Sequence, residues 1–151
     1  MSKLVPFATT LEVRDCCLCL HAQRAARALA RRFDEVLRPA GLTNQQFSLL
    51  MALNRPEPPT MAPVAELLGL DRTTLTAALK PLERRGLLVV EADATDRRSR
   101  RLRLSAAGHA VLLRTLPLWK QTHAEIGSRH PDVDMEQLRM WLRELGSDVA
   151  P

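Results

Sequence analysis

The chain has 151 residues, 46% of them hydrophobic and 26% charged, which suits one domain with a sizeable core and excludes disorder over the whole length. No apolar run is long enough to span a bilayer and no stretch resembles a secretory signal, so we expect a cytoplasmic protein with reduced cysteines. The net charge of +5 lies entirely in residues 72–103, and so concentrated a positive charge predicts a polyanionic partner, first of all nucleic acid.

The N-terminal part predicts two helices. Apolar residues three and four positions apart predict a long amphipathic helix over residues 11–37, which Pro39 and Gly41 end. Its apolar row consists of Leu18, Ala22, Ala25, Leu29, Phe33 and Val36. Thr43 and Gln46 have the spacing of a capping box and start a second helix. Residues 54–59 predict a loop.

The middle of the chain predicts a helix-turn-helix. Pro63 suits the first turn of a short helix over residues 64–68, and Gly69 suits its left-handed C-terminus. Asp71 caps a third helix, whose inward row is Leu75, Leu79 and Leu82. The other face of this helix is polar and basic.

Two strands and two further helices follow. Gly86 ends the third helix, and residues 87–90 and 101–104 predict a β-hairpin around the charged turn ADATDRRSR. Ser105 caps a helix that runs toward Ile126 and should bend or break at Pro117. Asp134 caps the last helix, which should end before Gly146. Its apolar row is Leu138, Leu142 and Leu145.

These elements predict a mainly α-helical protein with a small β-hairpin wing: a winged helix-turn-helix domain plus N- and C-terminal dimerisation helices. We assign residues 1–151 to a single unit, residues 43–104 to the DNA-binding lobe, and residues 10–38 and 105–146 to a helical dimerisation lobe. The apolar rows of the first, fifth and last helices exceed what one small winged domain can cover. We therefore expect a homodimer and a pseudo-palindromic double-stranded DNA operator.

The candidate DNA contacts lie on the third helix and the wing. Hydroxyl, lysine and arginine side chains on a helix suit the major groove, and arginines on a β-ribbon suit the minor groove. The candidates are Arg72, Thr73, Thr74, Thr76, Lys80 and Arg84 on the helix, and Asp96, Arg97, Arg98 and Arg100 on the wing. The alternative is that both are ordinary solvated surfaces.

Four segments resemble the multiple-antibiotic-resistance regulator (MarR) family of bacterial transcription factors. They are LTNQQFSLL, LDRTTLTAALKPLERRGLL, DRRSRRLRLSAAG and LPLWKQT, which begin at residues 42, 70, 96 and 116. The resemblance implies a dimer with paired terminal helices that acts as a repressor. It also implies that Asp96 orients wing arginines and that Arg98 contacts the minor groove. Pro81 inside the third helix is unusual for a helix, but the resemblance accommodates it.

Cys16, Cys17 and Cys19 form a cluster with three open interpretations. They are small apolar residues packed in the dimer interface, a redox switch, or part of a metal or haem site with His21. Cys19 stands at a spacing from Phe47 similar to that of the reactive cysteine in the hydroperoxide-sensing branch of the family. That branch uses tyrosines, whereas this chain has none and Phe33 stands about where one is expected. A single ligand cluster argues against a closed zinc site, so we predict no metal.

The resemblance also implies an effector pocket between the lobes, one that takes small aromatic or phenolic anions. Its candidate lining residues are His21, Arg24, Phe47, Leu50 and Met51, and Arg24 would suit a carboxylate. The alternative is a filled core in which Phe47 and Met51 only pack.

The chain carries no phosphate loop, nucleophile elbow or paired-histidine motif. We therefore predict no enzyme, no catalytic residue and no cofactor. Two alternatives remain open, a small thiol-dependent enzyme and a winged-helix module that binds protein instead of DNA.

Overall fold

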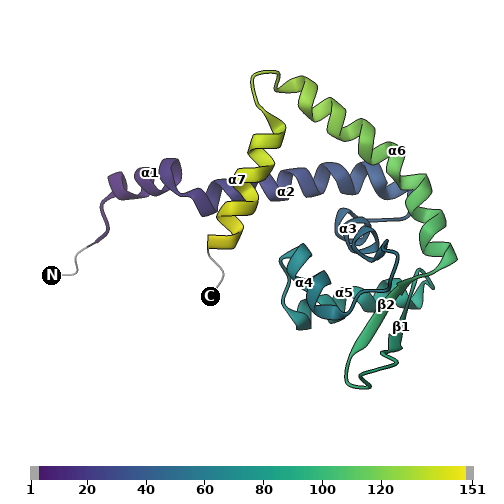
Figure 1. Cartoon of the computed structure of the whole chain (residues 1–151). Helices are drawn as coiled ribbons and strands as arrows, with labels where there is room; N and C mark the ends of the chain where they lie inside the picture. The colour runs from purple at the N-terminus through teal and green to yellow at the C-terminus, as the bar shows by residue number, and fades with distance from the viewer. Residues whose placement is uncertain (1–3, 149–151) are drawn as a thin grey trace.

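The computed structural model describes residues 4–148 and has a winged lobe with a long helical arm (Figure 1). The arm consists of the first two helices. The elements, in chain order, are α1 (Phe7–Cys16), α2 (Leu18–Leu37), the 3₁₀ helix η1 (Arg38–Ala40), α3 (Asn44–Leu53), α4 (Met61–Leu68), α5 (Arg72–Arg84), β1 (Leu88–Ala92), β2 (Arg100–Leu104), α6 (Ala106–Arg129) and α7 (Met135–Asp148). This architecture confirms the predicted fold class. None of the described helices is long and apolar enough to cross a membrane.

The core lies where α3, α4, α5 and the hairpin meet the end of α2 and the start of α6. Leu75, Leu79 and Leu82 are all buried there, as their spacing predicted. The capping box of α3 is present, because Thr43 Oγ1 accepts from the Gln46 N–H at 3.2 Å and the Gln46 side chain accepts from the Thr43 N–H. The capping box therefore defines the start of α3, and packing in the core stabilises the rest of this helix.

The helix-turn-helix forms around Gly69, which has a φ of +63°. That left-handed conformation reverses the chain within three residues, and Asp71 then caps α5. The predicted start of α4 at residue 64 is wrong, because α4 begins at Met61. Pro63 still lies in the first turn, where its missing N–H costs no helix bond.

The wing is an antiparallel pair in which Leu88 faces Leu104 and Ala92 faces Arg100. Both strands differ by a residue or two from their predicted bounds. Thr60, which precedes α4, forms an isolated bridge with Arg101, and the Leu102 N–H donates to Pro59 O at 2.9 Å. The base of the wing is therefore hydrogen-bonded to the segment that leads into α4.

The single helix predicted over residues 11–37 is wrong, because the chain breaks at Cys17. Cys17 has an extended backbone, its N–H ends α1 on Val13 O, and its Sγ accepts from the Leu20 N–H to start α2. No residue of α1 is buried. The helix has no core contact that would hold it in line with α2.

A break of the helix at Pro117 and a helix end before Gly146 do not occur. Helix α6 continues through Pro117, and its neighbours Leu118 and Trp119 pack against the core on the far side of the proline. The Leu113 carbonyl, which loses its donor to Pro117, lies on a residue that is 73% exposed and can bond water. Helix α7 continues past Gly146, which has no positive φ and therefore does not end a helix there.

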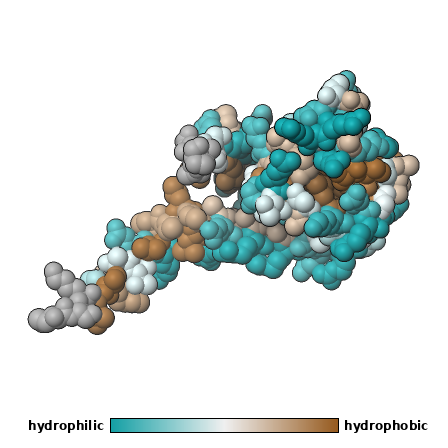
Figure 2. Space-filling view, turned by 90° about the horizontal axis from the view of Figure 1, so that it is seen from below, coloured by the Kyte–Doolittle hydropathy of each residue, from teal (hydrophilic) through white to brown (hydrophobic). Residues whose placement is uncertain are grey.

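Many apolar side chains of the arm and of α7 have no cover within one chain. The large exposed residues on these helices include Phe7, Val13, Leu18, Leu29, Leu138, Trp141, Leu142 and Leu145. Figure 2 shows brown residues recurring along the arm, whereas teal residues cover much of the winged lobe. Exposed apolar rows of this extent are typical of a protein interface.

Candidate DNA-binding surface

Helix α5 has a buried side and a polar, cationic side. Leu75 and Leu82 are fully buried, and this orients the opposite face of the helix outward. The outward face carries exposed Arg72, Thr73, Thr76, Lys80 and Arg84. The helix is 13 residues long and runs through Pro81 without a break. Its outward side therefore presents hydrogen-bond donors and positive charge along its length.

The threonines of α5 are not equivalent. Thr74 donates both its N–H and its hydroxyl to Asp71, at 2.7 and 2.9 Å, so its side chain serves the helix cap. These bonds, the N–H bond first, lower the pKa of the Asp71 carboxyl. The Thr76 hydroxyl donates to Arg72 O at 2.8 Å, which leaves its methyl group and oxygen lone pairs for a partner. Within residues 4–148 the Thr73 hydroxyl makes no hydrogen bond, so it has the most freedom to meet a base edge.

The wing turn exposes Arg97 and Arg98. Asp96 Oδ1 accepts from the Arg98 backbone N–H at 3.0 Å, and Asp96 O accepts from the Ser99 N–H at 2.9 Å. Asp96 therefore shapes the backbone that carries Arg98, and it contacts no guanidinium among the described residues. Any orienting effect of Asp96 on the arginines acts through the backbone.

A buried carboxylate that does hold a wing arginine is Asp93, which is not among the predicted site residues. Asp93 is 6% exposed and forms an ion pair with Arg101 Nε. Hydrogen bonds from the Thr95 hydroxyl and N–H, and then from Arg101, hold the pKa of the Asp93 carboxyl far below its ordinary value. An Asp two residues before a Thr in a turn is typical of a side chain that caps its own loop, and this pattern could have identified it.

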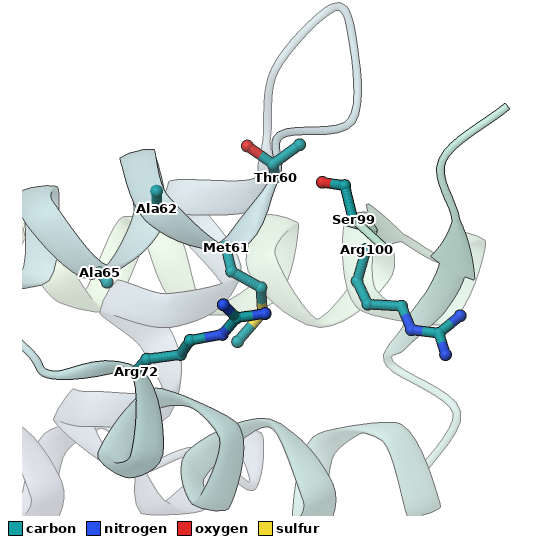
Figure 3. A pocket seen from close by; sticks show the side chains of 7 residues that line it. All are labelled: Thr60, Met61, Ala62, Ala65, Arg72, Ser99 and Arg100. Carbon is teal, nitrogen blue, oxygen red and sulfur yellow. The ribbon is translucent and has the colours of Figure 1, made fainter. Parts of the chain in front are cut away.

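A hollow of about 350 Å³ separates the start of α5 from the wing (Figure 3). Arg72 extends toward it from α5, and Arg100 lines it from β2 with its guanidinium turned away from Arg72, while Thr60 and Ser99 lie at its upper edge in the figure. Neither arginine pairs with a carboxylate anywhere in residues 4–148. The wall between helix and wing is therefore positively charged and open to an anion.

A second hollow, of about 370 Å³, lies between α3, the end of α4 and α6. Phe47 and Met51 line it, as expected for the effector pocket. The other three expected residues do not: Leu50 is fully buried in the core, and His21 and Arg24 lie exposed on α2. Within the single chain these two lie on the first half of α2, which belongs to the projecting arm, and not at the hollow. The lining also includes residues that were not expected there: Ser48, Ala52, Leu67, Leu68, Leu116 and Trp119.

The three cysteines lie at the joint between α1 and α2. Cys16 and Cys19 are exposed and Cys17 is half-buried, and all three are free thiols. Cys19 Sγ lies 3.1 Å from Gln23 Nε2. Among the residues whose placement is described, no three His, Cys, Asp or Glu side chains are arranged to hold a metal ion. Cys16, Cys19 and His21 therefore form no site within one chain.

Comparison with known proteins gives the family. The sequence profile of the MarR family matches residues 40–99. The transcriptional regulator MosR of M. tuberculosis, solved in complex with DNA, is 40% identical, with a TM-score of 0.79 over 87% of this chain and 95% of that one. The transcriptional repressor CouR, bound to a 23-mer DNA duplex, is 27% identical, with a TM-score of 0.72 over 99% and 100%.

The regulator SlyA shares the fold at 22% identity and a TM-score of 0.75, with 88% of this chain and 94% of that chain covered. The alignment to MosR, at 40% identity, covers 95% of that relative. The chain belongs to the MarR family of transcriptional regulators.

Proposed function

We propose that the protein is a homodimeric, sequence-specific DNA-binding regulator that acts as a repressor at a pseudo-palindromic operator. The observation that carries this proposal is the orientation of α5, whose buried leucines turn Arg72, Thr73 and Lys80 outward beside an arginine-bearing wing. Such a helix fits the major groove, and Arg97 and Arg98 on the wing fit the minor groove. We propose that a regulator of this kind acts in the bacterial cytoplasm, where it has access to DNA.

The homodimer is supported by the uncovered apolar rows of the arm and α7. Leu29, Trp141 and Leu142 are each about half exposed in the single chain, which leaves a long apolar strip in water. A second copy would cover that strip by two-fold symmetry. It would also set the two α5 helices about one turn of DNA apart.

Replacing Arg98 with Ala is expected to weaken operator binding by about 1–3 kcal/mol, because Arg98 is exposed at the turn and supplies a specific contact. A fluorescence-anisotropy titration on DNA upstream of the protein's own gene measures the change at fixed salt and competitor. Lys120→Ala removes the same charge from the exposed surface of α6 and should bind like the parent. Equal affinity of Arg98→Ala and parent would contradict the role of the wing.

Release from DNA has two proposed triggers. The first is a small aromatic or phenolic effector in the hollow lined by Phe47, Met51 and Trp119, whose walls are mainly apolar. The second is thiol oxidation at the α1–α2 joint, favoured by the exposure of Cys16 and Cys19 on either side of Cys17. An organic hydroperoxide would oxidise one thiol to a sulfenic acid and leave as the alcohol. A neighbouring thiol would then displace water and form a disulfide.

One equivalent of organic hydroperoxide is expected to lower the operator affinity of the reduced parent at least about tenfold, and a dithiol reductant should restore it. The reason is that a disulfide at the joint would change the course of the arm that pairs the two subunits. The variant with Cys16, Cys17 and Cys19 all changed to Ser keeps a hydroxyl cap at the start of α2 and should not respond. A parent that binds equally before and after peroxide would exclude the thiol trigger and leave the effector.

We propose further that the protein is not an enzyme. The same peroxide experiment distinguishes a sensor from a thiol-dependent enzyme, because a sensor consumes oxidant once per subunit and an enzyme continues to turn over. A winged-helix module that binds protein instead would show no sequence preference among the DNA duplexes.

A further inference from the structure

Asp93 is a buried carboxylate at the end of β1 with every hydrogen bond directed into the wing. Its Oδ1 accepts from the Thr95 N–H at 2.8 Å, the Thr95 hydroxyl at 2.7 Å and the Asp96 N–H at 3.1 Å. Its Oδ2 meets Arg101 Nε. Oδ1 therefore binds the start of the turn, and Oδ2 binds Arg101 on the opposite strand, β2.

Arg101 continues this chain of contacts out of the wing. Its Nη1 donates to Pro58 O at 2.9 Å, across 43 residues of sequence. Arg101 also forms the bridge with Thr60, the residue just before α4. A single guanidinium thus joins the wing turn, through Asp93, to the segment that starts the helix-turn-helix.

The other ion pair of the hairpin has no such link. Glu91 and Arg103 lie on opposite strands, with side chains that are 42% and 49% exposed. Among the described residues, the Arg103 side chain donates only to Glu91. Exposed pairs of this kind contribute little to stability. In the other pair the Arg101 side chain is 39% exposed but the Asp93 side chain is only 6% exposed, so removing Arg101 would leave a buried carboxylate without its partner.

We propose that Asp93 and Arg101 are a positioning pair that sets the wing turn relative to α4 and α5, and thereby determines which minor-groove sequence the wing accepts. The inference rests on the proposed DNA-binding function. A two-stranded hairpin is marginally stable by itself, so the direction of its tip depends on what its base contacts. Arg97 and Arg98 lie in the turn to which Asp93 is hydrogen-bonded. The position of that turn therefore determines how far both side chains extend into a groove.

The experiment compares minor-groove selectivity in matched variants. The probe is the operator duplex with 2,6-diaminopurine in place of adenine in its A·T-rich steps, which adds an amino group to the minor groove and keeps the major-groove edge of adenine. We expect diaminopurine to weaken operator binding by the parent about tenfold or more. It should weaken operator binding by Asp93→Asn less than about threefold. The amide introduced by Asp93→Asn would keep the oxygen that accepts from Thr95 and Asp96. It would replace the charged acceptor that faces Arg101 by an NH2 group, which cannot accept from Arg101 Nε.

Glu91→Gln is the matched control, because it removes the exposed pair from the same hairpin. Diaminopurine should lower the operator affinity of Glu91→Gln as much as it lowers that of the parent. Arg101→Lys keeps the charge but cannot reach both Asp93 and Pro58 O, so it should lose selectivity as Asp93→Asn does. If Asp93→Asn fails to fold, Arg101→Lys alone decides the outcome by the same criterion. A full diaminopurine penalty in the folded Asp93 or Arg101 variant, or its loss in Glu91→Gln, would overturn the proposal.

Amide hydrogen exchange without DNA separates this inference from the proposed function. Exchange at Leu102, whose N–H donates to Pro59 O, should become faster in Asp93→Asn and stay unchanged in Glu91→Gln. A parent with no sequence-specific DNA binding would contradict the regulator function, and the Leu102 result would then still decide whether the pair ties the wing. Unchanged exchange at Leu102 in Asp93→Asn would contradict the positioning role.

Discussion

Replacing Leu142 with Asp is expected to convert the dimer into a monomer and to lower operator affinity about 100-fold or more. Leu142 is 54% exposed in the middle of the apolar row of α7, between Leu138 and Leu145. A carboxylate there would lie inside the proposed dimer interface without a partner, and burying an unpaired charge is costly. Two linked DNA-binding lobes bind more tightly than one by about 10²–10⁴, and the monomer loses this gain.

Sedimentation analysis and the anisotropy titration, at the same protein concentrations, measure the two effects. Ser147→Asp is the matched control, because helical periodicity places Ser147 on the side of α7 opposite the row of leucines. It should remain dimeric and bind the operator like the parent. A Leu142→Asp variant that is still dimeric at these concentrations would show that α7 lies outside the interface.

The second large effect is expected at Gly108, near the start of α6. A Cβ at this position would lie 2.1 Å from Leu87 O and 2.7 Å from Leu104 Cδ1. Ser105 binds the same region, because its N–H donates to Leu87 O and its Oγ donates to Gly86 O. The backbone carbonyl cannot move aside as a side chain could, so Gly108→Ala should lower the free energy of unfolding by about 3 kcal/mol.

Urea unfolding at fixed protein concentration measures this change, since dimerisation contributes to the apparent stability. Gly127→Ala in the same helix is the control, because no atom lies within 4 Å of its added Cβ. Alanine has the higher helix propensity, so this variant should gain about 0.5–1 kcal/mol. Equal stability of the two alanine variants would show that α6 can shift away from Leu87 at little cost.

Four helix starts were predicted well because their causes are local. Thr43 with Gln46, Asp71, Ser105 and Asp134 each cap the helix that follows, through hydrogen bonds to backbone N–H groups two or three residues away. Such contacts need only neighbouring residues, so the pattern of residue types is enough to identify them.

Helix continuity was predicted less well, because packing decides it. Pro117 and Gly146 are both unfavourable inside a helix, yet the helices continue through them. At Pro117 the contacts of Leu118 and Trp119 with the core outweigh the lost hydrogen bond. At Cys17 no residue of α1 is buried, and the chain bends where the spacing of apolar residues had predicted one straight helix.

The sequence by itself determined the winged helix-turn-helix, the cationic face of α5 and the arginines of the wing, because apolar spacing, caps and charge are properties of short segments. The tertiary structure alone decided which side chains meet across long separations. It joined Asp93 to Arg101 and Pro58, it opened a hollow beside Trp119, and it kept His21 and Arg24 away from that hollow. These contacts depend on how the hairpin and α6 fold back onto the core, which no local pattern encodes.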